Sequence, residues 1–343
     1  MSDKKVWRKN GLLEVRGLTV RVEDKEILHG IDLEIQKGET HVLMGPNGAG
    51  KTTTTLMLLG LTEPNGGTAF IDGKDCTRNP IEVKRIVGYL PDNVGFYPDM
   101  TGRENLRFTG RLNGVGEHEL EERIDQLLER VGMTAAADQK TATYSKGMKQ
   151  RLGIADVLMK DPQVIILDEP TNGIDPEGMH ELLLLIRELA DKDKRTIMIS
   201  SHQLYQIQQV CDRVGIFVQG NLIACGRIEE LGKQILKDGY YRLEMKAEPE
   251  DERLRELIRG VYGVEEIGDG PEGMIIRSNQ DIREQISRIV VLNGYKLLHL
   301  RQCGQDLDEI YRRYFEKAGQ NNGVNRNKKK IRKIMSLGRQ DGE

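Results

Sequence analysis

Short apolar runs alternate with amphipathic stretches along the first two thirds of the chain. Thr40–Met44, Val164–Leu167 and Thr196–Ser200 are apolar or β-branched runs, typical of buried parallel strands. Glu117–Val131 and Pro176–Ala190 lie between such runs and carry their apolar residues on one helical face. Strands that alternate with helices in this way predict an α/β layer with a mainly parallel sheet.

The two ends of the chain show other patterns. Leu12–Val20 and Ile27–Ile35 alternate apolar and polar positions, which predicts an antiparallel sheet at the edge of the fold. After residue 230 the pattern predicts a small α+β domain that ends in a helix near Asp306–Lys317. Its strands and helices are expected, in alternation, at Tyr240–Met245, Arg253–Val261, Gly273–Arg277, Asp281–Leu292 and Leu297–Leu300.

These patterns divide the chain into an extension over 1–10, a main domain over 11–230, a small α+β domain over 231–317 and a tail over 318–343. The tail carries seven basic residues against two acidic ones. It allows two interpretations. We favour a disordered, solvated segment; the alternative is a basic amphipathic stretch at Lys328–Leu337 that lies on an anionic membrane surface.

Composition narrows the class of protein. The 343 residues carry a net charge of −3 and only 5% aromatic side chains, so no nucleic-acid partner is expected. No apolar run approaches the length of a membrane span, and the charged N-terminus lacks the apolar core of a secretory signal. The four scattered cysteines predict reduced thiols in the cytosol. Glycine is frequent, at 38 residues, which indicates either a loose chain or particular backbone tasks.

A glycine-rich segment supplies the first chemical motif. It fits GxxxxGK[ST] and lies between the strand Thr40–Met44 and a helical run over Thr53–Leu59, as a phosphate-binding loop requires. Lys51 would place its charge on the outer phosphates, and the Thr52 hydroxyl would ligate Mg²⁺. The residues expected to bind nucleotide are Gly45, Pro46, Asn47, Gly48, Ala49, Gly50, Lys51, Thr52 and Thr53.

Two adjacent carboxylates, Asp168 and Glu169, end the predicted strand Val164–Leu167. In a parallel sheet the ligand lies beyond the carboxyl ends of the strands, so both acids are expected beside the phosphate loop. Asp168 is expected to hold the Mg²⁺ shell. Glu169 is expected to act as general base on the water that attacks the γ-phosphate.

Residues 11–230 resemble the nucleotide-binding subunits of ABC transporters. Tyr144–Arg151 lies where the family's LSGGQ signature belongs, and its SKGMKQR variant resembles subunits that serve drug and multidrug exporters. Asn172–Asp175 resembles the D-loop, and His202 matches the switch histidine. The resemblance implies a P-loop NTPase fold, namely an ABC ATPase domain with a RecA-like core, an antiparallel β subdomain and a helical subdomain.

The resemblance also implies the mechanism and the assembly. Two subunits, expected to be identical, pack head to tail and sandwich ATP with Mg²⁺. Ser145 and the backbone of Gly147 would face the γ-phosphate held by the other subunit, and Asp175 would cross the dimer seam. His202 would contact the γ-phosphate and help to position Glu169. The dimer would bind a separate membrane permease and so lie at the cytoplasmic face of the cell membrane.

Two positions depart from the family pattern. Asp92 follows the strand Ile86–Leu90 where the family has glutamine; it can approach Mg²⁺, but it carries a charge that glutamine lacks. Val22 stands where an aromatic residue usually stacks on adenine, so weaker adenine selectivity is expected. The segment Val22–Lys51 also resembles the soluble ATPase of iron–sulfur cluster assembly, whose later motifs differ from those found here.

The leading hypothesis is therefore an ATPase subunit that energises a separate membrane exporter, and the alternative is a soluble ABC ATPase without a transport role. Asp92–Leu106 lies where the permease would dock, and Thr101–Glu104 within it predicts a helix capping box. Cys211 and Cys225 are expected to be packing residues. The remaining histidines are expected to be solvated or locally bonded, namely His29, His41, His118, His180 and His299.

Overall fold

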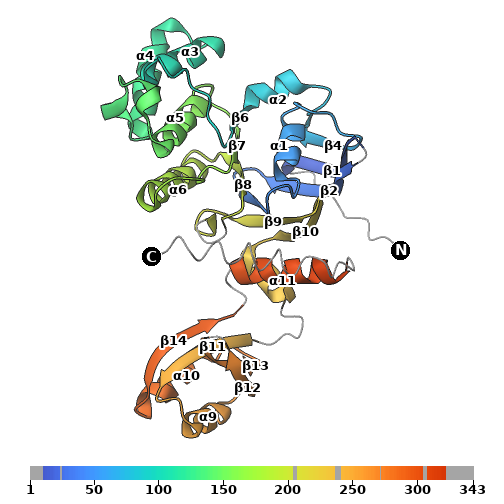
Figure 1. Cartoon of the computed structure of the whole chain (residues 1–343), viewed down its shortest axis with the longest axis vertical. Helices are drawn as coiled ribbons and strands as arrows, with labels where there is room; N and C mark the ends of the chain where they lie inside the picture. Colours follow the sequence, from blue (N-terminus) through green and yellow to red (C-terminus); the bar gives the residue numbers. More distant parts are fainter. Residues whose placement is uncertain are drawn as a thin grey trace. The chain divides into compact units, whose positions relative to one another are not determined.

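The computed structural model describes residues 11–23, 25–203, 207–235, 241–270, 272–303 and 307–321 (Figure 1). Contacts divide the chain into two units, Met1–Gly226 and Arg227–Glu343, which we describe separately. The predicted extension over 1–10 lies outside the described residues, as does most of the predicted tail over 318–343. The first four residues of that tail, 318–321, are helical, so the expectation of a disordered tail is wrong for them. None of the described helices combines the length and apolar composition that crossing a lipid bilayer would require.

A mainly parallel sheet in the order β10-β9-β3-β8-β7-β6 forms the centre of the first unit. Neighbouring strands run parallel from β9 to β6, and β10 pairs antiparallel with β9. Every residue of β3, β7 and β8 is buried, as the apolar runs predict. The strands are β3 (Thr40–Met44), β6 (Val87–Leu90), β7 (Val164–Asp168), β8 (Thr196–Ser201), β9 (Arg213–Val218) and β10 (Asn221–Gly226).

An antiparallel sheet in the order β2-β1-β4-β5 adds a second layer to this unit. Strands β1 (Gly11–Val22) and β2 (Lys25–Gln36) pair directly, which confirms the predicted antiparallel pair. Strands β4 (Gly66–Ile71) and β5 (Lys74–Asp75) extend it and are not predicted from the sequence. Buried residues of both sheets join in one apolar cluster that includes Phe217 of β9.

Helices complete the first unit. Figure 1 shows α3, α4 and α5 gathered as a helical subdomain, in green. The predicted capping box is present at the start of α3, because Thr101 and Glu104 exchange hydrogen bonds between side chain and backbone. The helices are α1 (Lys51–Leu58), α2 (Pro80–Ile86), α3 (Gly102–Leu112), α4 (Glu117–Arg130), α5 (Lys146–Leu158) and α6 (Pro176–Asp191).

The second unit contains an antiparallel sheet in the order β12-β13-β11-β14, with α9 and α10 packed against it. Strand β12 (Val264–Gly270) is absent from the sequence prediction. Its sequence is rich in acidic and glycine residues, and only Val264 and Ile267 pack on the core, so it lacks the expected alternation. The other elements are α8 (Ile228–Ile235), β11 (Tyr241–Glu248), α9 (Glu252–Arg259), β13 (Gly273–Ser278), α10 (Arg283–Leu292), β14 (Lys296–Gln302) and α11 (Leu307–Asn321).

Phe217 lies in the apolar cluster that both sheets share, so its substitution tests how much this cluster stabilises the fold. Phe217 is fully buried, so Phe217→Ala should lower the free energy of unfolding by about 3–5 kcal/mol through lost burial and a residual cavity. Urea unfolding followed by circular dichroism measures the change. Leu112→Ala is the control, because Leu112 is 72% exposed and its removal should change the free energy by less than about 0.5 kcal/mol. Equal losses in the two variants would contradict this account of the core.

Candidate nucleotide-binding site

The glycine-rich loop between β3 and α1 lies in close contact with residues of β9 and β2. A Cβ on Gly45 would lie 2.5 Å from the backbone oxygen of Phe217, and a Cβ on Gly50 would lie 2.5 Å from Leu28 Cδ2. Gly50 also has a φ of 106°, a left-handed conformation that favours glycine. The loop therefore presents bare backbone at the N-terminus of α1, the arrangement that holds phosphate groups in proteins.

The other predicted loop residues complete this turn. The N–H of Ala49 donates to the carbonyl of Pro46 over 3.1 Å, and Asn47 and Gly48 are exposed between them. Thr53 is half-buried in the first turn of α1. The exposed residues Asn47 and Gly48 thus lie shortly before the N-terminus of α1.

Lys51 lies at the centre of the loop. Its ammonium donates to the carbonyl of Gly45 over 2.7 Å and lies 3.5 Å from Glu169 Oε1. The side chain is only 5% exposed. Burial lowers the pKa of Lys51, and the carboxylates of Glu169 and Asp168 oppose that effect. A positive charge is thus held between the loop and the acidic end of β7.

Thr52 and Asp168 meet at the carboxyl ends of the central strands. The Thr52 hydroxyl lies 3.2 Å from Asp168 Oδ2, and the Ser200 hydroxyl donates to Asp168 Oδ1. Among the described residues, no cluster of three or more His, Cys, Asp or Glu side chains could hold a metal by itself. One hydroxyl and one carboxylate nevertheless fit Mg²⁺, which keeps several waters and also binds substrate phosphates.

Ser200 carries no role in the sequence prediction. Its position two residues before His202, at the end of β8, is the signal that could have found it, because β8 lies beside β7. Its hydrogen bond fixes one oxygen of Asp168 and leaves the other oxygen toward Thr52.

Glu169 and His202 form a hydrogen-bonded pair. Glu169 Oε2 lies 2.8 Å from His202 Nδ1 and 3.3 Å from the backbone nitrogen of the same histidine. Glu169 has a φ of 48°, a left-handed conformation that costs a non-glycine residue about 1–3 kcal/mol. Its N–H donates to the carbonyl of Ser200 over 2.9 Å, which anchors the backbone at this point. The hydrogen bond to Glu169 raises the pKa of His202, against a smaller opposing effect of burial.

The predicted signature and D-loop residues lie at helix N-termini. Ser145 caps α5 by accepting from the N–H of Met148 over 3.2 Å, and Asp175 caps α6 by accepting from the N–H of Gly178 over 3.1 Å. Ser145 and Asp175 are exposed, and Gly147 is half-buried. In the part of the chain that the structure describes, these residues form no hydrogen bond or ion pair with Lys51 or Glu169.

The two positions that depart from the family pattern differ in their surroundings. Val22 is 56% exposed at the turn between β1 and β2. Asp92 has defined partners. Its Oδ1 lies 3.2 Å from Lys146 Nζ and 3.2 Å from Asn172 Nδ2, and its charge also contributes to the raised pKa of His202.

The expectation for His41 is wrong in part. His41 is fully buried in β3; its Nδ1 lies 2.9 Å from Glu39 Oε1, and its Nε2 lies 3.9 Å from Cys225 Sγ. Burial disfavours the charged form, but the hydrogen bonds with Cys225 and Glu39 outweigh it and raise the pKa of His41 to about 9. Arg213 also donates to Cys225, so this thiol belongs to a polar network in addition to packing. Glu39 is a local partner, whereas Cys225 and Arg213 are too distant in sequence for spacing to reveal them.

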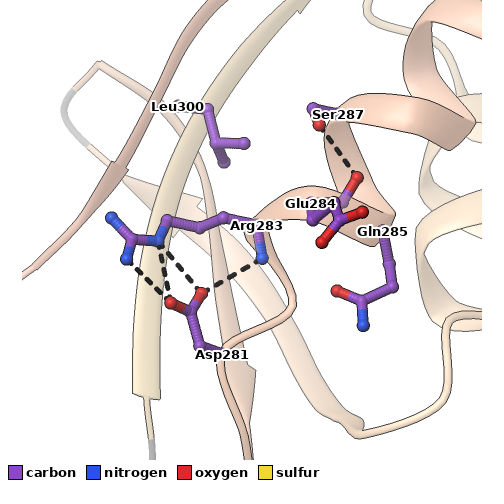
Figure 2. Close-up of a pocket in the computed structure, with 6 residues that line it drawn as sticks. All are labelled: Asp281, Arg283, Glu284, Gln285, Ser287 and Leu300. Atoms are coloured by element: carbon purple, nitrogen blue, oxygen red, sulfur yellow. Dashed lines mark hydrogen bonds and ion pairs between the residues drawn. The ribbon is translucent and has the colours of Figure 1, made fainter.

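A cavity of about 510 Å³ lies in the second unit, and none of the predicted site residues lines it (Figure 2). Two of its charged groups form a local pair, in which Arg283 binds the Asp281 carboxylate at 2.7 Å. The Ser287 hydroxyl likewise donates to the carbonyl of Glu284. Its lining residues are Asp281, Arg283, Glu284, Gln285, Ser287 and Leu300. We assign it no part in nucleotide chemistry.

Comparisons with known proteins agree with this geometry. Residues 28–172 match the family model for ABC transporters. The uncharacterized ABC transporter ATP-binding protein YdbJ of Bacillus subtilis (strain 168) is 35% identical over 300 residues, which cover 88% of this chain and 94% of YdbJ. This chain belongs to the ABC transporter family. The Nod factor export ATP-binding protein I of Burkholderia lata is 38% identical to this ABC protein over 214 residues, 62% of this chain and 70% of that protein. A solved ATP-binding subunit of an ABC transporter is 32% identical, with a TM-score of 0.60 over 65% of this chain and 92% of that one.

The ABC protein is an ATPase, the ATP-binding subunit that energises a membrane permease. The predicted α/β fold of a P-loop ATPase is confirmed. The alternative, an ATPase of iron–sulfur cluster assembly, is not favoured, because the relative that spans 88% of the chain is a transporter protein. The roles predicted for single side chains in this ABC subunit stay predictions.

The contact between Glu169 and His202 predicts a pH dependence. Because the pKa of His202 is raised, protonated His202 and Glu169 form a pair that stabilises the folded state. This stabilisation is fully present below the ordinary histidine pKa of about 6.5 and is lost as the pH rises through the raised pKa of His202. In the nucleotide-free ABC protein, Glu169→Gln should move the titration midpoint of His202 downward, as followed by NMR of the imidazole. Glu188→Gln, at an exposed carboxylate paired with Lys192, is the control and should leave the midpoint in place. An unchanged midpoint in Glu169→Gln would contradict the pairing.

Proposed function

We propose that the protein hydrolyses ATP with Mg²⁺ as one half of a dimer and drives export through a separate permease at the cytoplasmic face of the membrane. The observation that carries the proposal is the convergence of Lys51, Thr52 and Asp168 with the Glu169–His202 pair at one edge of the central sheet. Export is supported by a relative named for Nod factor export and by the signature variant at Ser145–Arg151.

Each group at this edge has a distinct task in the proposed reaction. Lys51 and the loop backbone bind the phosphates, and the Thr52 hydroxyl and the Asp168 carboxylate hold Mg²⁺. When bound, Mg²⁺ neutralises the charge that develops on the phosphate oxygens. Glu169 accepts the proton of the attacking water, and His202 holds the Glu169 carboxylate in place through the 2.8 Å hydrogen bond.

The second subunit would complete each site. Ser145 and Gly147 lie at the N-terminus of α5, where the helix dipole favours the γ-phosphate of a nucleotide bound to the other subunit. The exposure of Ser145 and Asp175 supports this arrangement, because a second copy can reach both residues. We propose a homodimer in which Asp175 lies at the seam.

An apolar surface patch supports a permease contact near Asp92–Leu106. Tyr97 is 52% exposed, Phe108 is 39% exposed and Leu112 is 72% exposed. The rings of Tyr97 and Phe108 pack edge to face with their centroids 5.1 Å apart. Exposed aromatic groups of this kind are enriched in protein interfaces, and we propose that an apolar cytoplasmic helix of the permease binds here.

The proposed chemistry predicts the behaviour of Glu169→Gln. The variant should lose ATP turnover by at least about 100-fold, because the proton acceptor is gone, while ATP binding is kept. ATP should then accumulate a stable dimer, which light scattering coupled to gel filtration measures. Lys51→Ala is the matched control, because it removes the phosphate ligand and should form no ATP-dependent dimer. Turnover near the wild-type value in Glu169→Gln would exclude Glu169 as the general base.

The proposed permease contact predicts the effect of a charge in the patch. Phe108→Glu should abolish co-purification of a polytopic membrane protein from detergent-solubilised membranes, because a carboxylate would be buried in an apolar interface. Mass spectrometry of the purified material measures the loss. Ile81→Glu is the control: Ile81 is 64% exposed on α2, outside the patch, and its substitution should leave the co-purified protein in place. Equal recovery with both variants would place the contact elsewhere.

A further inference from the structure

The loop that follows β6 contacts α5, the helix that begins at the predicted signature, through several side chains of that helix. Lys146 Nζ lies 3.2 Å from Asp92 Oδ1, and the side chain of Gln150 donates to the backbone oxygen of Asp92 over 3.1 Å. One turn farther along, Gly153 packs against Leu90, so closely that a Cβ would lie 2.4 Å from Leu90 Cδ1. The loop and the helix are therefore in contact from the end of β6 onward.

The same carboxylate also contacts the segment that follows Glu169. Asn172 Nδ2 lies 3.2 Å from Asp92 Oδ1, and the N–H of Asn172 donates to the carbonyl of Glu169 over 3.1 Å. The aliphatic chain of Lys146 packs over Gly173 in that segment, because a Cβ there would lie 3.2 Å from Lys146 Cδ. Asp92 Oδ1 is thus the point at which the loop, the signature helix and the segment after Glu169 meet.

Asp92 departs from the family pattern, and its partner Lys146 belongs to the signature variant. Asp92 replaces the usual glutamine, and Lys146 lies directly after Ser145, where LSGGQ has glycine. The two side chains contact each other, so each supplies a counter-charge to the other. Lys146 is 35% exposed and Asp92 is 34% exposed, so the pair is partly shielded from solvent.

We propose that Asp92 and Lys146 form a charge-dependent tether, and that Asp92 is a positioning residue and not a ligand of Mg²⁺. The tether holds Ser145 and Gly147, at the start of α5, at a fixed position relative to the loop that carries the proposed permease contact. A movement of that loop is then passed through Lys146 to the residues that face the nucleotide of the second subunit. The ion pair itself is independent of the proposed function, but its turnover readout, the permease contact and the facing second subunit rest on that proposal.

A double-mutant cycle tests the tether. Asp92→Asn and Lys146→Met should each lower kcat by about 3- to 10-fold. The kcat of the double variant should be no lower than that of the less active single variant, since both changes remove the same interaction. The Mg²⁺ concentration for half-maximal turnover should stay within about twofold of the wild-type value, because Thr52 and Asp168 are intact. The exchanged pair Asp92→Lys with Lys146→Asp should recover part of the lost kcat, which loss of a merely structural contact would not predict.

Lys149→Met supplies the matched control, since it removes the same charge from α5 about one turn beyond Lys146. In the double variant with Asp92→Asn, the two effects on the activation free energy should add, as expected for independent sites. Additive losses in the Asp92–Lys146 cycle, unchanged kcat in both single variants, or a raised Mg²⁺ requirement in Asp92→Asn that persists with Lys146→Met would each overturn the tether.

Two further measurements keep the test decisive. Thermal unfolding of every variant identifies any change that destabilises the fold. If Asp92→Asn does so, Asp92→Gln, which introduces the family's usual residue and also removes the charge, replaces it in the cycle. Fluorescent-ATP binding provides a readout that does not need hydrolysis. If Glu169→Gln retained full turnover, the proposed catalytic roles would fail while the cycle could still be evaluated, so the two failures are distinguishable.

Discussion

The phosphate loop has no room for side chains at its two ends, and the first unit is arranged around that constraint. Gly45 abuts the backbone of Phe217 in β9, and Gly50 abuts Leu28 in β2. These contacts come from different sheets, the central parallel sheet and the antiparallel sheet. Both sheets must therefore be folded and packed together before the loop can take its shape, and the apolar cluster that they share holds them in place.

The chemistry of the site follows from the order of the central strands. Strands β3, β8 and β7 are parallel neighbours, so the loop after β3, Ser200 at the end of β8 and Asp168 at the end of β7 emerge at one edge. This juxtaposition brings a hydroxyl and a lysine from one segment to two carboxylates from another. The helix N-termini that carry Ser145 and Asp175 remain exposed for a second subunit.

The sequence predicts those parts of the molecule that a local pattern specifies. The loop from Gly45 to Thr52 and the buried strand before Asp168 are visible in the residues, because their chemistry depends on neighbouring positions. Strand β12 escapes prediction because it gains its place by pairing with β13 and not through an apolar alternation. The surroundings of His41 escape it because Cys225 approaches across the sheet, from 184 positions along the chain. The contact between Asp92 and Lys146 is of the same kind: both residues are visible in the sequence, but their contact depends on the packing of α5.

The ion pair between Lys51 and Glu169 connects the phosphate-binding loop to the acidic end of β7. The ammonium group lies 3.5 Å from the carboxylate that is proposed to activate water, and it also donates to the carbonyl of Gly45. A phosphate chain that enters the loop competes for the same ammonium group and withdraws it from Glu169. Because one ammonium group contacts both the loop and this carboxylate, the loss of Lys51 would disturb the two ends of the site together.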